Sequence, residues 1–163
     1  MSDKLSSHSA TQRLLSAISS LSNVYTSARS LNDDIRELLE QIEIVEKLPL
    51  SINLCQLDEW RPRLLSKMRM KISELEEEYR RVVDSEWAKL LGTIERDGPA
   101  MSSISFTFAD DMQLVLSFFN KVHQTALSND LFVTKIRSNI PIVPLNIEKA
   151  VFRLISDIKT LDI

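Results

Sequence analysis

The stretch that decides the fold is residues 48–75, LPLSINLCQLDEWRPRLLSKMRMKISEL. An apolar entry, Leu48 to Leu57, leads into a long amphipathic segment whose first half is basic. Leu48, Leu50, Ile52 and Leu54 alternate with smaller or polar residues, which fits a packed connector or a short strand. Asp58 is expected to cap the following helix, with Pro62 in its first turn or so, where a missing N–H is tolerable.

A long helix is predicted over about residues 58–96, with an apolar stripe on one side. At 1.5 Å per residue this rod is roughly 58 Å long. One small domain cannot cover such a rod alone, so contact with a partner is expected. Gly98-Pro99 is expected to stop it. The stripe consists of Leu65, Met68, Ile72, Leu75, Tyr79, Val82 or Val83, Trp87, Leu90 and Ile94.

The chain before this helix carries an apolar stripe at spacings of three and four from Ala10 to Val45. One continuous coiled-coil helix fits it, and so do two helices broken near residues 30–34, where Ser, Asn and Asp favour an N-cap. The serines that precede Ser30 lower helix propensity, so the break is preferred. Residues 1–9 are expected to be a disordered tail.

The chain after the long helix contains one more predicted helix, Phe108 to Leu127, which ends the helical domain expected over 10–128. Residues 129–145 form a linker whose Pro141 and Pro144 disfavour helix. Residues 146–163 begin a small C-terminal domain. Ile147, Val151, Leu154, Ile158 and Leu161 fit a helix, whereas AVFRLI fits a strand.

The composition limits the classes of function. The chain has 163 residues, a formal net charge of −3, two glycines and one cysteine, so a phosphate-binding glycine loop or an internal disulfide framework is not expected. No run of residues approaches the roughly 18 apolar positions of a membrane span. His8 and His123 are the only histidines and Cys55 the only cysteine. No catalytic, metal or cofactor site is therefore predicted, and an enzyme would need a polar pocket around His123 or Cys55.

Two sets of side chains are candidates for binding. Arg63, Lys67 and Lys71 form one stripe at i, i+4 and i+8, which suits DNA phosphate or an acidic partner, or a solvated face paired with Glu74 and Glu78. The solvated face is favoured. Candidates for a partner interface are Trp60, Leu64, Met68 and Trp87, although the two tryptophans fit a core equally well.

The segment Leu50 to Glu76, with Ser51-Ile52, Gln56, Arg61, Leu64-Leu65-Ser66 and Lys71-Ile72, resembles the third helix of the Sld-five-type subunit of the GINS complex. An acidic helix, IRELLEQIEIVEKL, precedes it, and Phe108-Ala109-Asp110-Asp111, Val143-Pro144-Leu145 and Val151-Phe152-Arg153-Leu154 follow in the family's order. The similarity covers roughly residues 31–155. Pro62 departs from the family pattern, the family's N-terminal aromatic and basic segment is hard to find, and we expect the family's β domain to be truncated or lost in this chain.

This resemblance implies a nuclear, non-catalytic scaffold in a heterotetramer with the other GINS subunits. Through that complex the chain would join the MCM helicase ring and a RecJ-like activator in DNA replication, with DNA contact only indirect or weak and no membrane contact. The implied fold is mainly α: a helical bundle with one long central helix, then a linker and a short β-domain segment. The alternative is a coiled-coil subunit of a kinetochore or vesicle-tethering complex, which one continuous helix over 10–47 would favour.

Overall fold

The computed structural model describes residues 2–48, 54–101, 105–130 and 139–161, with side chains from residue 10 and, after the first gap, from residue 60. Within these residues the chain is helical and has no strand. The elements are α1 (Ser2–Glu46), α2 (Leu54–Arg80), the π-helix η1 (Arg81–Trp87), α3 (Ala88–Met101), α4 (Phe106–Asp130) and α5 (Leu145–Leu161). The prediction of a mainly α-helical chain is confirmed, whereas the predicted β segment is absent from the part described.

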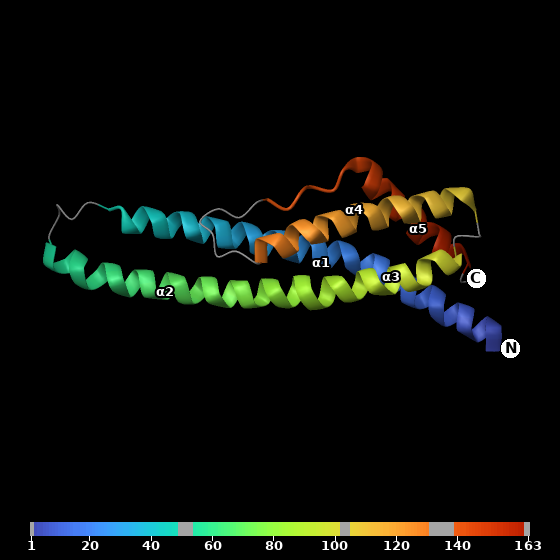
Figure 1. The fold of residues 1–163 in the computed structure, drawn as a ribbon, viewed down its shortest axis with the longest axis horizontal. Coiled ribbons are helices and arrows are strands. Elements are labelled where there is room, and N and C mark those ends of the chain that lie inside the picture. The colour runs from blue at the N-terminus through green and yellow to red at the C-terminus, as the bar shows by residue number, and fades with distance from the viewer. Residues whose placement is uncertain (1, 49–53, 102–104, 131–138, 162–163) are drawn as a thin grey trace.

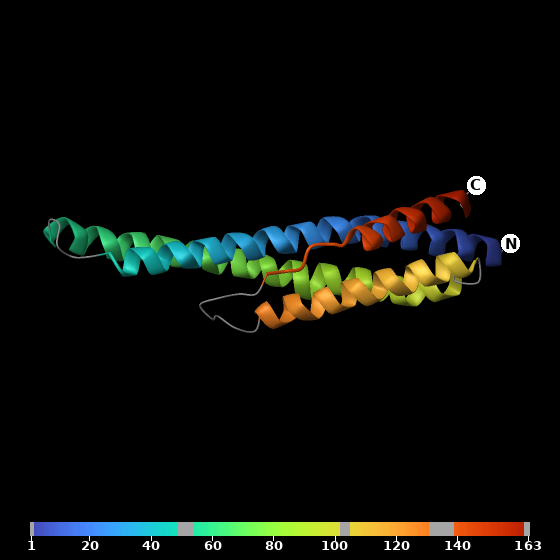
Figure 2. The ribbon, with the colours of Figure 1, turned by 90° about the horizontal axis from the view of Figure 1, so that it is seen from above.

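The molecule is an elongated helical hairpin that is thickened at one end (Figures 1 and 2). Helix α1 runs antiparallel to the succession α2–η1–α3 and contacts all three. Helices α4 and α5 pack beside the half that contains α3 and the N-terminal part of α1. We call this half the body, and we call residues 34–48 and 60–75, which extend beyond it as two helices, the arm.

The core follows this division. One cluster fills the body, where α1, η1, α3, α4 and α5 all contribute fully buried side chains such as Ile18, Trp87, Ile94, Phe108 and Leu154. A second, smaller cluster consists of Ile42, Leu65 and Ile72, with Leu38, Leu39, Val45 and Met68 packed against it. The arm is therefore held together by a single seam between two helices.

The π-helix keeps the buried side of the second rod facing α1. Leu65, Ile72 and Tyr79 are seven residues apart, and so are Trp87 and Ile94, but eight residues separate Tyr79 from Trp87. A spacing of eight would rotate an ordinary α-helix away from its partner, and the wider turn of η1 absorbs the extra residue. The predicted long helix is thus a succession of three segments rather than one regular α-helix.

Local chemistry explains where the two later helices begin. Ser105 caps α4, because its Oγ accepts a hydrogen bond from the Phe108 N–H at 3.0 Å and its carbonyl accepts one from Ala109. Pro144 ends the extended segment 139–144, and its carbonyl accepts hydrogen bonds from the N–H groups of Ile147 and Glu148. Glu148 then lies in the first turn of α5, near the positive end of the helix dipole.

Two predictions for the N-terminal third are wrong. Helix α1 is continuous from Ser2 to Glu46, so residues 30–34 do not break it, and residues 2–9 are its first turns rather than a disordered tail. The reason for continuity is tertiary. Asn32, which could have capped a second helix, is fully buried and accepts a hydrogen bond from Asn129 of α4 over 3.4 Å, and Ala28 and Ile35 are fully buried on either side.

The boundaries of the second rod also differ from those predicted. Helix α2 begins at Leu54, so Asp58 is not its cap, and Pro62 lies inside it rather than in its first turn. At the other end α3 continues through Gly98 and Pro99 to Met101. Packing holds that last turn, since a Cβ on Gly98 would lie only 3.0 Å from Met112 Sδ on α4. Most of the alternating segment, residues 49–53, lies outside the residues described.

The last segment is a helix, so the strand reading of residues 146–163 is wrong and the helix reading is confirmed. Its buried positions are Ile147, Ala150, Leu154 and Ile158, spaced three or four residues apart. Helix α5 lies against α1 and α4 and contributes these residues to the body's core. No β domain starts within the described part of this segment.

Candidate interaction surface

The residues considered for chemistry do not converge. His123 is buried in α4, where its Nε2–H donates to the carbonyl of Val83 in η1 at 2.8 Å and its ring stacks obliquely on Trp87. It therefore ties α4 to the π-helix. Across the residues with described side chains, no group of three or more His, Cys, Asp or Glu is placed to hold a metal ion. The side chain of Cys55 is not described.

Trp87, one of the four interface candidates, is a core residue. Its side chain is fully buried, and Tyr25 meets it edge-on with ring centroids 6.2 Å apart. Tyr25 in turn contacts Phe119 in the same manner, and burial raises the pKa of the Tyr25 hydroxyl. Trp87 therefore presents no surface to a partner in this structure, and the core alternative holds for it.

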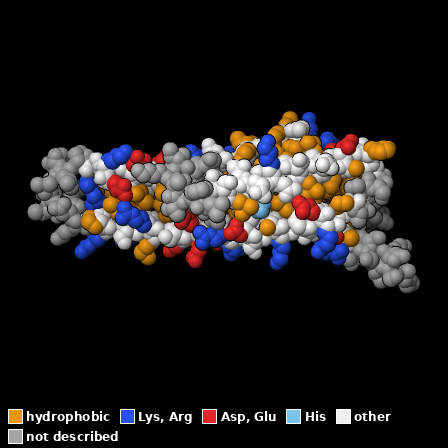
Figure 3. All heavy atoms as spheres, viewed as in Figure 1, with side chains coloured by type: hydrophobic (Ala, Val, Ile, Leu, Met, Phe, Trp, Pro, Cys, Tyr) orange, Lys and Arg blue, Asp and Glu red, His pale blue; other side chains and the backbone are white. Residues whose placement is uncertain are grey.

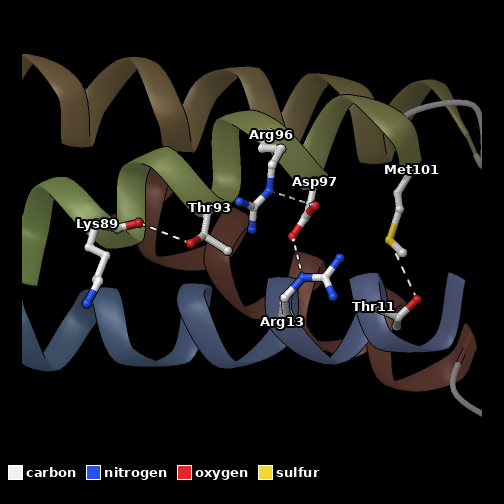
Figure 4. Close-up of polar contacts among 7 residues, drawn as sticks. All are labelled: Thr11, Arg13, Lys89, Thr93, Arg96, Asp97 and Met101. Atoms are coloured by element: carbon white, nitrogen blue, oxygen red, sulfur yellow. Dashed lines mark hydrogen bonds and ion pairs between the residues drawn. The ribbon is translucent and has the colours of Figure 1, made fainter. Parts of the chain in front are cut away.

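Two buried carboxylates fasten the body from within. Asp97 on α3 lies between Arg13 of α1, 3.2 Å from its Oδ2, and Arg96, 3.4 Å from its Oδ1 (Figure 4). Burial raises the pKa of Asp97, but the hydrogen bonds and charges of the two arginines outweigh it, so that the net pKa is lowered. Asp111 on α4 accepts two hydrogen bonds from the guanidinium of Arg153, at 3.0 and 2.8 Å, which secures α5.

The other three interface candidates lie on the arm. Trp60, Leu64 and Met68 follow one another at i, i+4 and i+8 along α2. Trp60 is 51% exposed, Leu64 and Met68 are both half-buried, and Met68 packs against the small cluster of the arm. Only Trp60 leaves most of a large apolar side chain open to solvent.

The predicted basic stripe is on the surface of the same helix. Arg63, Lys67 and Lys71 are all exposed, and Lys71 Nζ lies 3.8 Å from Glu74. The expected pairing with Glu74 is therefore confirmed for Lys71. Neither Arg63 nor Lys67 makes a hydrogen bond or ion pair with the described residues. The structure thus brings Trp60 and the basic stripe together on the side of α2 that points away from α1.

Met70 belongs to this surface and was missed from the sequence. It is 64% exposed, and it is placed three residues beyond Lys67 and seven beyond Arg63. The sequence did hold a signal for Met70, which lies five residues after the buried Leu65 and two before the buried Ile72. Each separation places Met70 more than a quarter turn around the helix from the buried stripe. We call Trp60, Arg63, Lys67, Met70 and Lys71 the outer face of the arm.

The charges of the arm are segregated between its two helices. Residues 34–48 contain five acidic and two basic residues, whereas residues 60–75 contain five basic residues and only Glu74 as an acid. Arg69 of α2 pairs with Glu46 of α1 at 2.7 Å along one edge of the hairpin. Figure 3 shows that charged side chains of both signs surround scattered hydrophobic ones on this part of the molecule.

A shallow apolar groove lies between α1 and α5 in the described part of the body. Tyr25, Phe119, Val151 and Phe152 contribute to its wall, and Phe152 is 66% exposed. Arg29 and Glu148 are its charged members. Ser19, Ser22 and Thr26 of α1 add hydroxyl groups to the same groove.

Comparison with known proteins adds no relative: no family model, curated protein or solved structure matches this chain. None of the helices in the described ranges has an apolar stretch long enough to cross a bilayer.

Proposed function

We propose that this chain is a non-catalytic helical subunit of a larger assembly, of the coiled-coil kind found in kinetochore or vesicle-tethering complexes. The observation that carries this proposal is the continuity of α1 from Ser2 to Glu46. An unbroken helix was the feature that separates this class from a compact GINS-like bundle. The two-helix arm beyond the body supports the same view, since a long thin element is suited to spanning a distance between partners.

A GINS-like scaffold in DNA replication is the second candidate, and the pattern of residues 50–76 together with the elements that follow it supports this. Under this proposal the chain would be nuclear and would bind the other GINS subunits, with the MCM ring and a RecJ-like activator reached through the complex. The continuous α1 and the helical α5 count against it, because the resemblance implied a strand where α5 lies.

One co-expression experiment separates the two candidates. The full chain is produced together with the three other GINS subunits of its source organism and analysed by size-exclusion chromatography with light scattering. We expect the chain to stay outside the GINS peak and to elute early for its mass, as an elongated particle does. A stoichiometric heterotetramer that contains it would replace the leading proposal with the GINS one.

A second experiment tests the leading proposal on its own terms. The chain is tagged at its own locus, purified after mild cross-linking, and its partners are quantified by mass spectrometry. We expect a fixed set of helical partners in constant ratio, with cross-links to lysines of α2. Recovery of the chain alone, without any partner in constant ratio, would contradict a role as a subunit.

A further inference from the structure

The outer face of the arm combines positive charge with exposed apolar side chains. Between Trp60 and Ser73 the sequence holds five basic residues and no acid. Trp60 and Met70 lie on the same side as Arg63 and Lys67, and both apolar side chains are more than half exposed. A helix with this pairing of basic and apolar groups is typical of elements that lie in the plane of a membrane surface.

Some of the basic side chains of α2 already contact another group of the protein, and others do not. Arg69 is paired with Glu46, Lys71 lies near Glu74, and Arg61 donates to the carbonyl of Leu48 at 2.5 Å. Arg63 and Lys67 have no such contact with the described residues. These two exposed cations lie one turn apart and can face an external anion, and the loosely held Lys71 extends their row.

The acidic residues of α1 do not cancel this charge, whereas Glu74 of α2, which lies near Lys71 and lines a hollow with Met70, reduces it at the C-terminal end of the outer face. Glu37, Glu40 and Glu43 are on α1, which lies behind α2 as seen from the outer face. A helix is about 10 Å across, so these carboxylates are roughly a Debye length or more from an object that touches the outer face. An anionic surface would therefore attract the α2 side of the arm and leave the α1 side in solution.

We propose that the outer face of the arm binds the anionic phospholipid surface of a membrane. Trp60 would sit at the level of the headgroups, and Arg63, Lys67 and Lys71 would contact lipid phosphates and carboxylates. Met70, which shares a hollow with Glu74 and Glu77, would lie at the edge of the contact. Duplex DNA would pair its phosphates with the basic side chains but offers no apolar contact to Trp60 or Met70. An acidic protein helix would need a continuous apolar seam to pack on, and the apolar residues of the outer face are only Trp60 and Met70.

The inference deepens the vesicle-tethering form of the proposed function, but it is tested on the isolated full-length chain. Vesicles of phosphatidylcholine alone, and of phosphatidylcholine with about one-third phosphatidylserine, are sedimented with the protein. We expect binding to the anionic vesicles only, weakening as salt is raised. The subunit proposal could fail in cells while this binding persists, or stand while it is absent, so the two failures are distinguishable.

Paired variants locate the contact. Arg63→Gln with Lys67→Gln should weaken partitioning onto the anionic vesicles by roughly 30-fold, at about one kcal/mol for each basic residue near the surface. Lys89→Gln with Lys121→Gln removes the same charge from exposed positions on the body and should change partitioning less than about 3-fold. Circular dichroism establishes that both variants are as helical as the parent.

Tryptophan fluorescence reports the apolar part of the contact. In a Trp87→Phe background, Trp60 is the only tryptophan, and its emission should shift to the blue and resist quenching when anionic vesicles are added. The proposal is overturned if the vesicles do not bind, or if both charge variants weaken binding equally. It is also overturned if duplex DNA binds as tightly as the vesicles and Trp60 emission does not shift.

Discussion

Asp97 is the residue whose charge the body depends on most clearly. Its carboxylate is buried between Arg13 and Arg96, and its net pKa is lowered. Asp97→Asn should lower the free energy of unfolding by about 1 kcal/mol at neutral pH, a modest value because Arg13 is half exposed. Urea titration followed by circular dichroism measures this loss.

The pH dependence of that loss has a definite sign. A carboxyl group whose pKa is lower in the folded state stabilises the protein above its unfolded pKa, near 3.9, and this stabilisation fades as the pH falls through the folded value. The difference between the parent and Asp97→Asn should therefore be full near pH 7 and shrink below about pH 4. The exposed neighbour variant Asp110→Asn is the control and should show little difference at either pH. A gap that grew on acidification would contradict this assignment.

The two glycines should respond differently to alanine. No atom lies within 4 Å of a Cβ built on Gly92, which is exposed inside α3, so Gly92→Ala should stabilise the protein by about 0.5–1 kcal/mol through helix propensity. Gly98→Ala places its methyl group against Met112 and should stabilise less or destabilise. Thermal unfolding of the two variants ranks them, and a Gly98→Ala that gained more than Gly92→Ala would mean that α3 and α4 are not in close contact there.

At the residue scale the sequence predicted hydrophobic positions better than their roles. Trp60 and Trp87 occur in similar amphipathic contexts, yet one is half exposed and the other is fully buried. The difference arises because Trp87 lies opposite Tyr25 and His123, which are 62 and 36 residues away along the chain. Such pairings depend on how three helices meet, which periodicity within one helix does not encode.

At the scale of elements, the π-helix left a trace in the sequence. The apolar stripe fits either Val82 or Val83, and both prove to be buried. This ambiguity marks the place where the buried residues of the stripe are eight positions apart instead of seven. It follows that removing one residue from η1 should restore an ordinary α-helix with its buried positions in phase.

Paired deletions test this register. Deleting the exposed Ser85 from η1 should leave the melting temperature within a few degrees of the parent, while deleting the exposed Ser73 from α2 should lower it more, since the buried residues Tyr79, Val82 and Val83 then rotate off the seam that Leu65 and Ile72 define. Circular dichroism against temperature gives both values. An equal fall in melting temperature for the two deletions would show that η1 does not absorb the extra residue.

Element types were predictable where a stripe was long, and element boundaries were not. The Ser-Asn-Asp cluster near residue 32 is a sound local signal for a helix start, but the Asn32 side chain is buried inside a continuous helix and contacts Asn129 of α4. Long-range packing also determined that residues 145–161 form a helix rather than a strand. Four buried positions at helical spacing outweighed the β-branched residues of AVFRLI.

At the scale of the whole molecule, the unequal lengths of the helices create the arm. Helices α1 and α2 extend past α4 and α5, so among the described side chains their far ends are joined by the small cluster around Ile42, Leu65 and Ile72 and by the Arg69–Glu46 pair. The sequence indicated that long stripes would need partners, but it did not show which stretch would be left with two helices. That stretch proved to contain Trp60, Leu64, Met68 and the basic stripe.

The central claim is that α1 is one unbroken helix, and a distance between spin labels on it tests this most directly. Labels replace the exposed residues Ser19 and Glu40 in a Cys55→Ser background, and labelled chain is diluted with unlabelled chain so that only distances within one molecule are recorded. At 1.5 Å per residue, a continuous helix predicts a narrow distribution centred near 32 Å. A distribution centred well below about 25 Å would show that the chain folds back near residues 30–34 and would contradict the account.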